Sequence, residues 1–289
     1  GHSGLAMGYA AGLSDPVGIR KAVGQELVAQ SYDEVSRTDG DWDTFAPLVQ
    51  QASRICTRHF DRWREHDLAE WEPIATEVPF RLALPMPGGS GRSSRWDFTG
   101  VMDLVIRQRA TGLWLVVDHK TWGGSNRDAF SSELMTETAR VGYVWALREA
   151  LKATGQDRLV SGFAYNVIRK KDPSEPALNQ HASCKGQGCP ACHHTGKGVV
   201  SKVVSDTTAD AYRRLATTHP HIDPAPYADH VQALTARGDV FEFREQVPVE
   251  DDAIEGWIGE TFTATRHLAT AARAKAQLRN RSACVPFVG

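Results

Sequence analysis

The chain has 289 residues, of which 41% are hydrophobic and 24% charged, and these proportions are ordinary for a globular protein. No apolar run approaches the ~20 residues that a membrane-spanning helix needs, and no charged segment followed by an apolar core resembles a signal peptide. We therefore expect a cytoplasmic protein without a membrane partner. The formal net charge of -2 gives no support to a broadly basic surface, although a local basic cluster is compatible with it.

Helical periodicity dominates the first third of the chain. Apolar positions at helical spacing predict helices over residues 17–37 and 41–67, and the sequence from Ser14 to Pro16 is typical of a helix start. From about Glu72 the period changes toward two, which predicts strands separated by short turns. These predicted strands cover residues 74–84, 95–108 and 113–120.

The second half of the chain alternates between the two periods. We expect a helix over 131–153, a strand over 159–170 and a cysteine-rich loop over about 181–197. The remaining predicted elements are helices over 206–218 and 226–236, a strand over 239–249, and a closing helix with Ile254, Trp257, Ile258 and Phe262 on one face.

The order of these elements indicates the fold class. Helices come first, then hairpin strands, then a crossover helix that leads to another strand, which is typical of an α/β fold with one central mixed sheet flanked by helices. We expect a single domain over residues 1–289, with the cysteine-rich segment 181–198 inserted in it as a metal-binding loop.

The strand predicted over 113–120 is apolar on both faces and then ends in Asp118, His119 and Lys120. Side chains alternate along a strand, so Asp118 and Lys120 share a face, and a short turn can bring Asp103 beside them. A buried charge is costly and two close carboxylates repel, and a divalent cation resolves both problems. Oxygen ligands suit Mg²⁺ or Mn²⁺, and Lys120 could orient a metal-bound water for phosphodiester hydrolysis. The alternative is a simple salt bridge at a strand end, because a bare Asp-x-Lys is common.

The segments "GVMD" (Gly100 to Asp103) and "VVDHKT" (Val116 to Thr121) resemble the motif of the PD-(D/E)xK nuclease superfamily, specifically its RecB-like and phage-type exonucleases. In that motif an Asp after a glycine-containing strand is followed by a hairpin, an apolar strand, and then Asp or Glu, any residue and Lys. The resemblance implies a restriction-endonuclease-like core. It also implies metal ligands at Asp103, Asp118 and the backbone carbonyl of His119, and a catalytic lysine at Lys120.

The same resemblance implies further site residues. The family places a histidine early on a helix, and His2 shares a helical face with Tyr9, so His2 is a candidate metal ligand. The family also places a Gln and a Tyr four residues apart after the lysine. Tyr143 matches and is a catalytic candidate, but residue 139 is Ala, and Tyr143 could instead be a core aromatic. Glu77 could complete the metal shell or could be a strand-edge carboxylate.

A basic cluster follows the strand predicted over 159–170. It consists of Arg169, Lys170 and Lys171, and this strand and loop resemble those of phage-type family members. Basic side chains at such a place are candidates for contacts with DNA phosphates. The alternative is an ordinary solvated strand end.

The segment from His181 to Gly198 reads C-x4-C-x2-C-H-H, which is typical of a zinc knuckle. Three thiolates and one imidazole would complete a tetrahedral Zn²⁺ site, and the alternative is a flexible loop with incidental cysteines. Some RecB-like nucleases hold an iron–sulfur cluster, and Cys284 could belong to one only if this chain is a fragment. The candidate zinc ligands are Cys184, Cys189 and Cys192, with His193, His194 or His181 as the fourth.

Together these features predict a metal-dependent DNA nuclease, an exonuclease of recombination or repair that could be encoded by a phage. Its partners would be DNA and a helicase or recombination protein. An alternative is a nucleic-acid-binding module with weak or no catalysis that uses the cysteine loop and the basic cluster. A site-specific endonuclease on the same fold ranks lower, because the sequence offers no recognition domain.

Overall fold

The computed structural model describes residues 2–38, 42–89, 91–124, 126–180, 182–192, 197–202 and 206–273. Its centre is a five-stranded mixed sheet with the strand order β1-β2-β3-β4-β7. Strands β3 and β4 run parallel, and the other neighbouring pairs are antiparallel. All five lie where the period-two pattern predicts strands. They are β1 (Trp71–Pro85), β2 (Arg92–Gln108), β3 (Trp114–Trp122), β4 (Val160–Arg169) and β7 (Glu242–Pro248).

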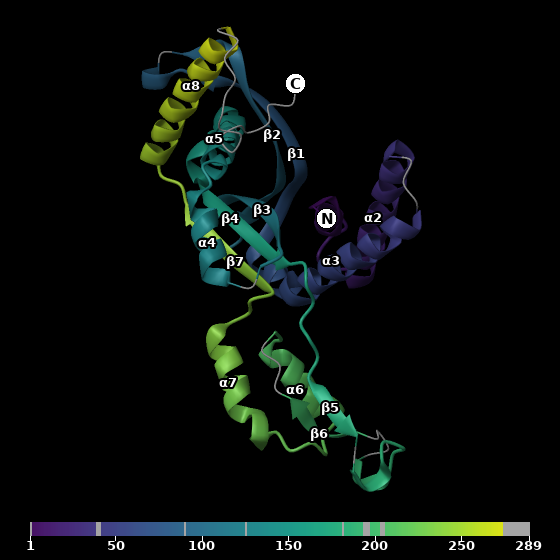
Figure 1. The fold of residues 1–289 in the computed structure, drawn as a ribbon. Coiled ribbons are helices and arrows are strands. Elements are labelled where there is room, and N and C mark those ends of the chain that lie inside the picture. Colours follow the sequence, from purple (N-terminus) through teal and green to yellow (C-terminus); the bar gives the residue numbers. More distant parts are fainter. Residues whose placement is uncertain are drawn as a thin grey trace.

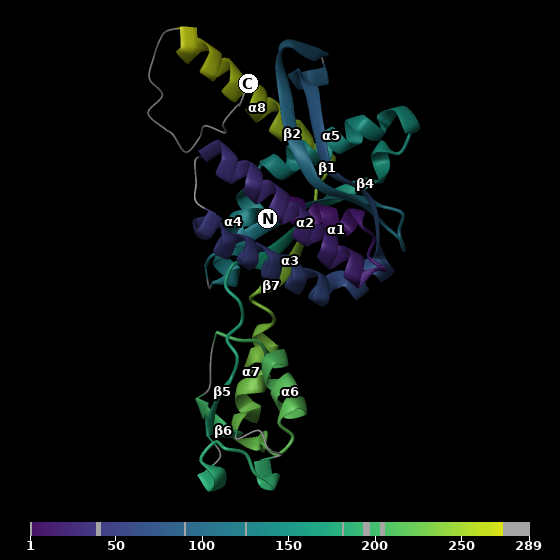
Figure 2. The same ribbon diagram turned by 90° about the vertical axis from the view of Figure 1, so that its right-hand side faces the viewer.

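Helices cover both faces of this sheet (Figures 1 and 2). The first three, α1 (His2–Ala10), α2 (Pro16–Thr38) and α3 (Trp42–Glu70), pack on one face. The opposite face is covered by α4 (Arg127–Thr136), α5 (Ala139–Leu151) and α8 (Asp251–Arg273). The α/β class with a mixed central sheet and flanking helices is therefore confirmed.

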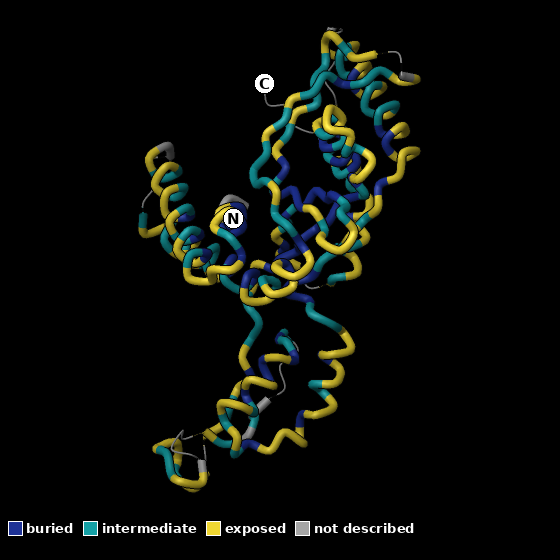
Figure 3. The backbone as a smooth tube through the Cα atoms, turned by 180° about the vertical axis from the view of Figure 1, so that it is seen from behind, coloured by how far each residue is buried: buried dark blue, intermediate teal, exposed yellow. Residues whose placement is uncertain are grey.

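The central strand β3 is buried on both faces, which explains its continuous apolar sequence. Leu115 and Val117 pack toward α1, α2 and α3, whereas Trp114 and Val116 pack toward α4, α5 and α8. The dark blue segments of Figure 3 mark the same central region as the most buried part of the chain. The polar residues at the end of β3 therefore lie next to the hydrophobic core in the chain and in space.

The prediction of one helix over 131–153 is wrong in one respect, because the structure has two helices there. Helix α4 ends at Thr136, Glu137 has an extended ψ of 114°, and α5 begins at Ala139. The Arg140 side chain donates hydrogen bonds to the carbonyl oxygens of Leu134, Met135 and Glu137, and so satisfies the end of α4. Periodicity does not reveal such a break, because the apolar positions continue across it.

An insert of residues 170–241 lies between β4 and β7 and extends away from the central sheet (Figure 1). It contains a two-stranded sheet of β5 (Ala177–Gln180) and β6 (Lys197–Lys202), and the helices α6 (Ala209–Thr218) and α7 (Ala228–Arg237). The two helices agree with prediction, whereas β5 and β6 were not predicted. The insert has a hydrophobic cluster of its own, and the predicted cysteine-rich loop lies between β5 and β6. The buried members of that cluster are Ala209, Tyr212, Leu215, Ile222, Tyr227 and Leu234.

None of the helices in the described ranges has both the length and the apolar character that crossing a membrane requires.

Candidate active site

The register of the sheet aligns acidic residues on three neighbouring strands. Leu104 of β2 pairs with Val117 of β3, so the next position brings Asp103 opposite Asp118. On the other side of β2, the pairs Thr76–Leu104 and Val78–Met102 bring Glu77 opposite Asp103. The three acidic residues thus occupy one level of the sheet, at the point where the apolar part of β3 ends.

The side chain of Asp103 makes a hydrogen bond to β3 just beyond the point where the backbone pairing of β2 and β3 stops. The last paired residues of that ladder are Leu104 and Val117. One position further, the Oδ2 of Asp103 accepts a hydrogen bond from the backbone N–H of His119 at 2.8 Å. The carboxylate of Asp103 is therefore hydrogen-bonded to the backbone of the residue between Asp118 and Lys120.

Lys120 lies between two carboxylates. Its Nζ is 3.1 Å from the Oδ2 of Asp118 and 3.4 Å from the Oε2 of Glu137, and the Lys120 side chain is 32% exposed. Burial would lower the pKa of Lys120, but the charges and hydrogen bonds of Asp118 and Glu137 outweigh it and raise this pKa. Lys120 therefore carries a positive charge at neutral pH, so it acts as a fixed cation rather than as a proton acceptor.

Glu137 is a site residue that the sequence analysis missed. It lies at the break between α4 and α5, where the helix period gives no signal. Its Oε2 also accepts a hydrogen bond from the Tyr165 hydroxyl at 3.2 Å. Tyr165 is itself paired with Asp118 across β3 and β4. The break in the helix thus directs a carboxylate toward the end of β3.

Tyr143 of α5 lies beside the acidic residues and is also packed in the core. Its ring stacks on Phe163 at 6.1 Å and meets Phe80 edge-on at 5.6 Å. Burial raises the pKa of Tyr143, and the charges of Asp118 and Asp103 raise it further. Tyr143 is therefore a partly buried core aromatic whose raised pKa keeps its hydroxyl protonated, and its catalytic role stays a prediction.

Glu77 has a backbone conformation that is uncommon for its residue type. Its φ is 49°, in the left-handed region, inside strand β1. Non-glycine residues with such φ values cost free energy and gather at functional sites. Because Glu77 is opposite Asp103, the strained backbone lies at the same position along the sheet as Asp103 and Asp118.

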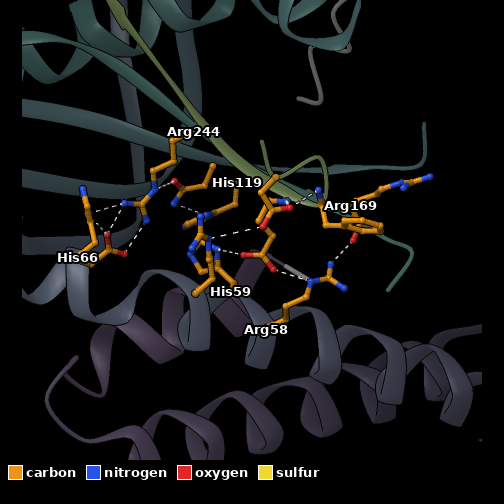
Figure 4. Close-up of polar contacts among 12 residues, drawn as sticks. Arg58, His59, His66, His119, Arg169 and Arg244 are labelled. Atoms are coloured by element: carbon orange, nitrogen blue, oxygen red, sulfur yellow. Dashed lines mark hydrogen bonds and ion pairs between the residues drawn. The ribbon is translucent and has the colours of Figure 1, made fainter. Parts of the chain in front are cut away.

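His119 points to the opposite face of the sheet from Asp118 and Lys120. Its side chain is 1% exposed and lies among α1, α3 and β4 (Figure 4). Its ring stacks on Tyr9 with centroids 5.8 Å apart, and its Nδ1 is 3.3 Å from the Nδ2 of Asn166. The structure therefore places the His119 ring away from the acidic residues, and only its backbone lies between them.

The predicted basic cluster divides into a buried and an exposed part. Arg169 is 6% exposed, is ion-paired with Asp206, and lies over the rings of Trp122 and Phe241 at 5.9 and 4.9 Å. Lys171 is exposed and is ion-paired with the same Asp206. Arg169 thus connects the end of β4 to the insert, and its contact with DNA stays a prediction, as do those of Lys170 and Lys171.

The cysteine-rich loop is described in part. Cys184 and Cys189 are partly exposed, and Cys192 ends a short 3₁₀ turn. Lys185, Gly186 and Gly188 have positive φ values of 48°, 84° and 92°, which makes a tightly turned backbone between the first two thiols. The side chain of Cys192 and the residues His181, His193 and His194 lie outside the described residues.

The structure describes both predicted metal sites incompletely. His2 begins α1, but its side chain also lies outside what is described. Among the side chains that are described, no group of three or more His, Cys, Asp or Glu could hold a metal ion. Asp103, Asp118 and Glu77 are described and do not form such a group by themselves, so the metal predicted there stays a prediction, as do the ligand sets of His2 and the cysteine loop.

Comparisons with known proteins assign no family to this arrangement. No protein-family model matches the sequence, and the comparison with curated proteins finds no match.

Proposed function

We propose that the chain is a metal-dependent DNA nuclease, and that it is an exonuclease of the PD-(D/E)xK type with a restriction-endonuclease-like core. One observation carries this proposal. Asp103 and Asp118 are opposite each other on neighbouring strands, and the charged Lys120 follows on the Asp118 face of the sheet. This is the arrangement of acid, acid and lysine that the resemblance implies, at the end of a buried strand.

The donor set suits a hard divalent cation. Asp103 and Asp118 would hold Mg²⁺ or Mn²⁺ through their carboxylates, with the backbone carbonyl of His119 as a further oxygen donor. When bound, such an ion supplies Lewis-acid stabilisation of phosphate charge and lowers the pKa of water. His2 and Glu77 are the further candidates for that shell.

The chain itself supplies the fixed charges and the orientation. Lys120 stays protonated because Asp118 and Glu137 raise its pKa. Its ammonium group would therefore orient the attacking water and stabilise negative charge on the phosphate by hydrogen bonding. The protonated hydroxyl of Tyr143 is a second donor near the same carboxylates.

The test is degradation of end-labelled linear DNA and of circular DNA with Mg²⁺, Mn²⁺ or EDTA. We expect metal-dependent loss of the linear substrate only, and at least a ~100-fold loss of rate in Lys120→Ala and in Asp118→Asn. The matched control is Lys152→Ala, because Lys152 is an exposed lysine on the same side of the sheet whose ammonium group lies 3.7 Å from Glu149 at the surface. Cleavage of circles would indicate an endonuclease instead.

DNA binding without cleavage under any metal would reject the enzyme and favour the alternative, a nucleic-acid-binding module. The insert gives that alternative some support, because it has its own hydrophobic cluster and carries the cysteine loop. Location in the cytoplasm and cooperation with a helicase or recombination protein are parts of the same proposal. Zn²⁺ in the cysteine loop is a separate proposal, since it concerns the insert alone.

A further inference from the structure

A second polar row crosses the sheet one residue beyond the acidic level, on the opposite face. It consists of His119 on β3, Asn166 on β4 and Arg244 on β7, which are register partners. The Nε of Arg244 donates to the Oδ1 of Asn166 at 2.6 Å, and the Nδ2 of Asn166 is 3.3 Å from the Nδ1 of His119. Because His119 and Asn166 are each 1% exposed, this row runs through the core (Figure 4).

Helix α3 fixes the far end of the row. Both side-chain oxygens of Asp67, which is 0% exposed, accept hydrogen bonds from the guanidinium of Arg244, one of them at 2.8 Å. The same guanidinium lies 3.9 Å from the ring centroid of Trp71 and 4.1 Å from that of Trp63. Arg244 therefore has its charge neutralised and its plane fixed by aromatic rings.

Tyr9 of α1 contacts both Asp67 and His119, and so links the two ends of the polar row. Its hydroxyl donates to the Oδ2 of Asp67 at 2.7 Å, while its aromatic ring stacks on His119. His59 of α3 packs edge-on against His119 at 5.7 Å. The imidazole of His119 is thus held by Asn166 on one side and by Tyr9 on another, and both lead to Asp67.

A polar network of this kind is a costly way to fill a core. Buried polar groups gain stability only when they are fully satisfied, and apolar replacements of similar volume are often as stable. In some proteins such a network instead selects a single geometry of the core. Here that geometry is imposed on the residue between Asp118 and Lys120, whose backbone N–H also bonds to Asp103.

We propose that His119 is a positioning residue, whose clamped ring fixes the backbone that carries Asp118 and Lys120. Adjacent strand residues point to opposite faces, so holding the ring of His119 on one face sets the direction of its two neighbours on the other. The inference rests on the proposed nuclease function for its consequence, because catalytic groups misplaced by ~1 Å lose rate by about 10²-fold. The claim that the ring of His119 fixes the backbone between Asp118 and Lys120 does not depend on the nuclease function.

The test compares two substitutions of His119. His119→Phe keeps the stacking on Tyr9 but removes the acceptor for Asn166, and His119→Asn keeps an acceptor near the Nδ1 position. We expect His119→Phe to lower the turnover of linear DNA by about 10- to 100-fold with a half-saturating DNA concentration within about twofold of wild type. His119→Asn should recover at least about tenfold of that loss.

Two further variants separate positioning from a general loss of stability. Tyr9→Phe removes only the hydroxyl and should fold, and we expect a several-fold loss of turnover from it. Leu115→Ala is the matched control, because Leu115 is a buried apolar residue on the same strand and the same face, four residues before His119. Equal losses in Leu115→Ala and His119→Phe, at matched thermal stability, would overturn the proposal.

A readout independent of catalysis keeps the two proposals distinguishable. Amide hydrogen exchange at His119 reports its bond to Asp103, and it should become about tenfold faster in His119→Phe but not in Leu115→Ala. If wild type cleaves no DNA while this exchange behaves as expected, the nuclease proposal fails and the positioning role stands. Unchanged exchange in His119→Phe would reject the positioning role, whatever the activity.

Discussion

Gly100 illustrates how a single residue decides the shape of the site. It lies in β2, three residues before Asp103, in a place where side chains from two elements meet. A Cβ atom at this position would lie 2.7 Å from the Cζ of Phe80 and 2.8 Å from the Cε1 of Tyr143. The glycine of the "GVMD" segment therefore allows Tyr143 to approach the sheet beside the acidic residues.

Gly100→Ala should therefore destabilise the protein by about 1–3 kcal/mol, because the rings of Phe80 and Tyr143 must move to admit the methyl group. Urea unfolding measures this change. The control is Gly123→Ala, since a Cβ there meets nothing within 4 Å, and its stability should change by less than about 1 kcal/mol. Equal stabilities of the two variants would show that the close approach at Gly100 is not required.

At the scale of elements, the sequence predicted what depends on local periodicity. Strands β1 to β4 and the helices α2 and α3 follow apolar spacing, and the start of α2 has a local cause, because Asp15 caps the N–H groups of Val17 and Gly18. The hairpin likewise predicted that Asp103 lies next to the end of β3. These features need only residues that are close in the chain or joined by one turn.

The missed features depend on partners far apart in the chain. Asp67 and Arg244 are separated by 177 residues, and no local pattern joins them. The break at Glu137 depends on the orientation of the Arg140 side chain, and β5 and β6 are short and interrupted by irregular register. Sequence reasoning therefore found the acidic face of the site but not the polar row behind it.

The cysteine loop gives a prediction at the same scale. If Cys184, Cys189 and Cys192 bind zinc, the purified protein should contain about one zinc ion per chain, and Cys189→Ser should lose it. Elemental analysis after growth with zinc measures this. A zinc-free wild-type protein would reject the site.

Cys56 is the matched control for that measurement. Burial raises the pKa of its thiol to about 11, with a further contribution from Glu242, so this thiol stays protonated and is a poor metal ligand. Cys56→Ala should therefore keep the zinc content of wild type. A loss of zinc in this variant would mean that metal content follows general folding and not the loop.

At the scale of the whole molecule, the Asp67–Arg244 pair joins the helices of one face to the last strand of the sheet. Burial would raise the pKa of Asp67, but the hydrogen bonds and the charge of Arg244 outweigh it, so the pKa is lowered. A carboxyl with a lowered pKa adds stability above its unfolded pKa of about 3.9, and that stability is lost as the pH falls through the folded pKa. The pair should therefore matter at neutral pH and lose its effect in acid.

Asp67→Asn should lower the free energy of unfolding by about 3–5 kcal/mol at pH 7, because it leaves the buried guanidinium of Arg244 without its counter-charge. The difference from wild type should begin to shrink as the pH falls below about 3.9, where Asp67 is protonated in the unfolded chain, and it should vanish only below the lowered pKa of the folded protein. Urea unfolding between pH 7 and pH 3 measures both effects. The control is Asp61→Asn on the same helix, where a 59% exposed carboxylate pairs with Arg20 at the surface and should contribute less than about 1 kcal/mol. A similar cost for the two variants at pH 7, or a constant difference down to pH 3, would mean that packing, and not this buried charge pair, joins α3 to the sheet.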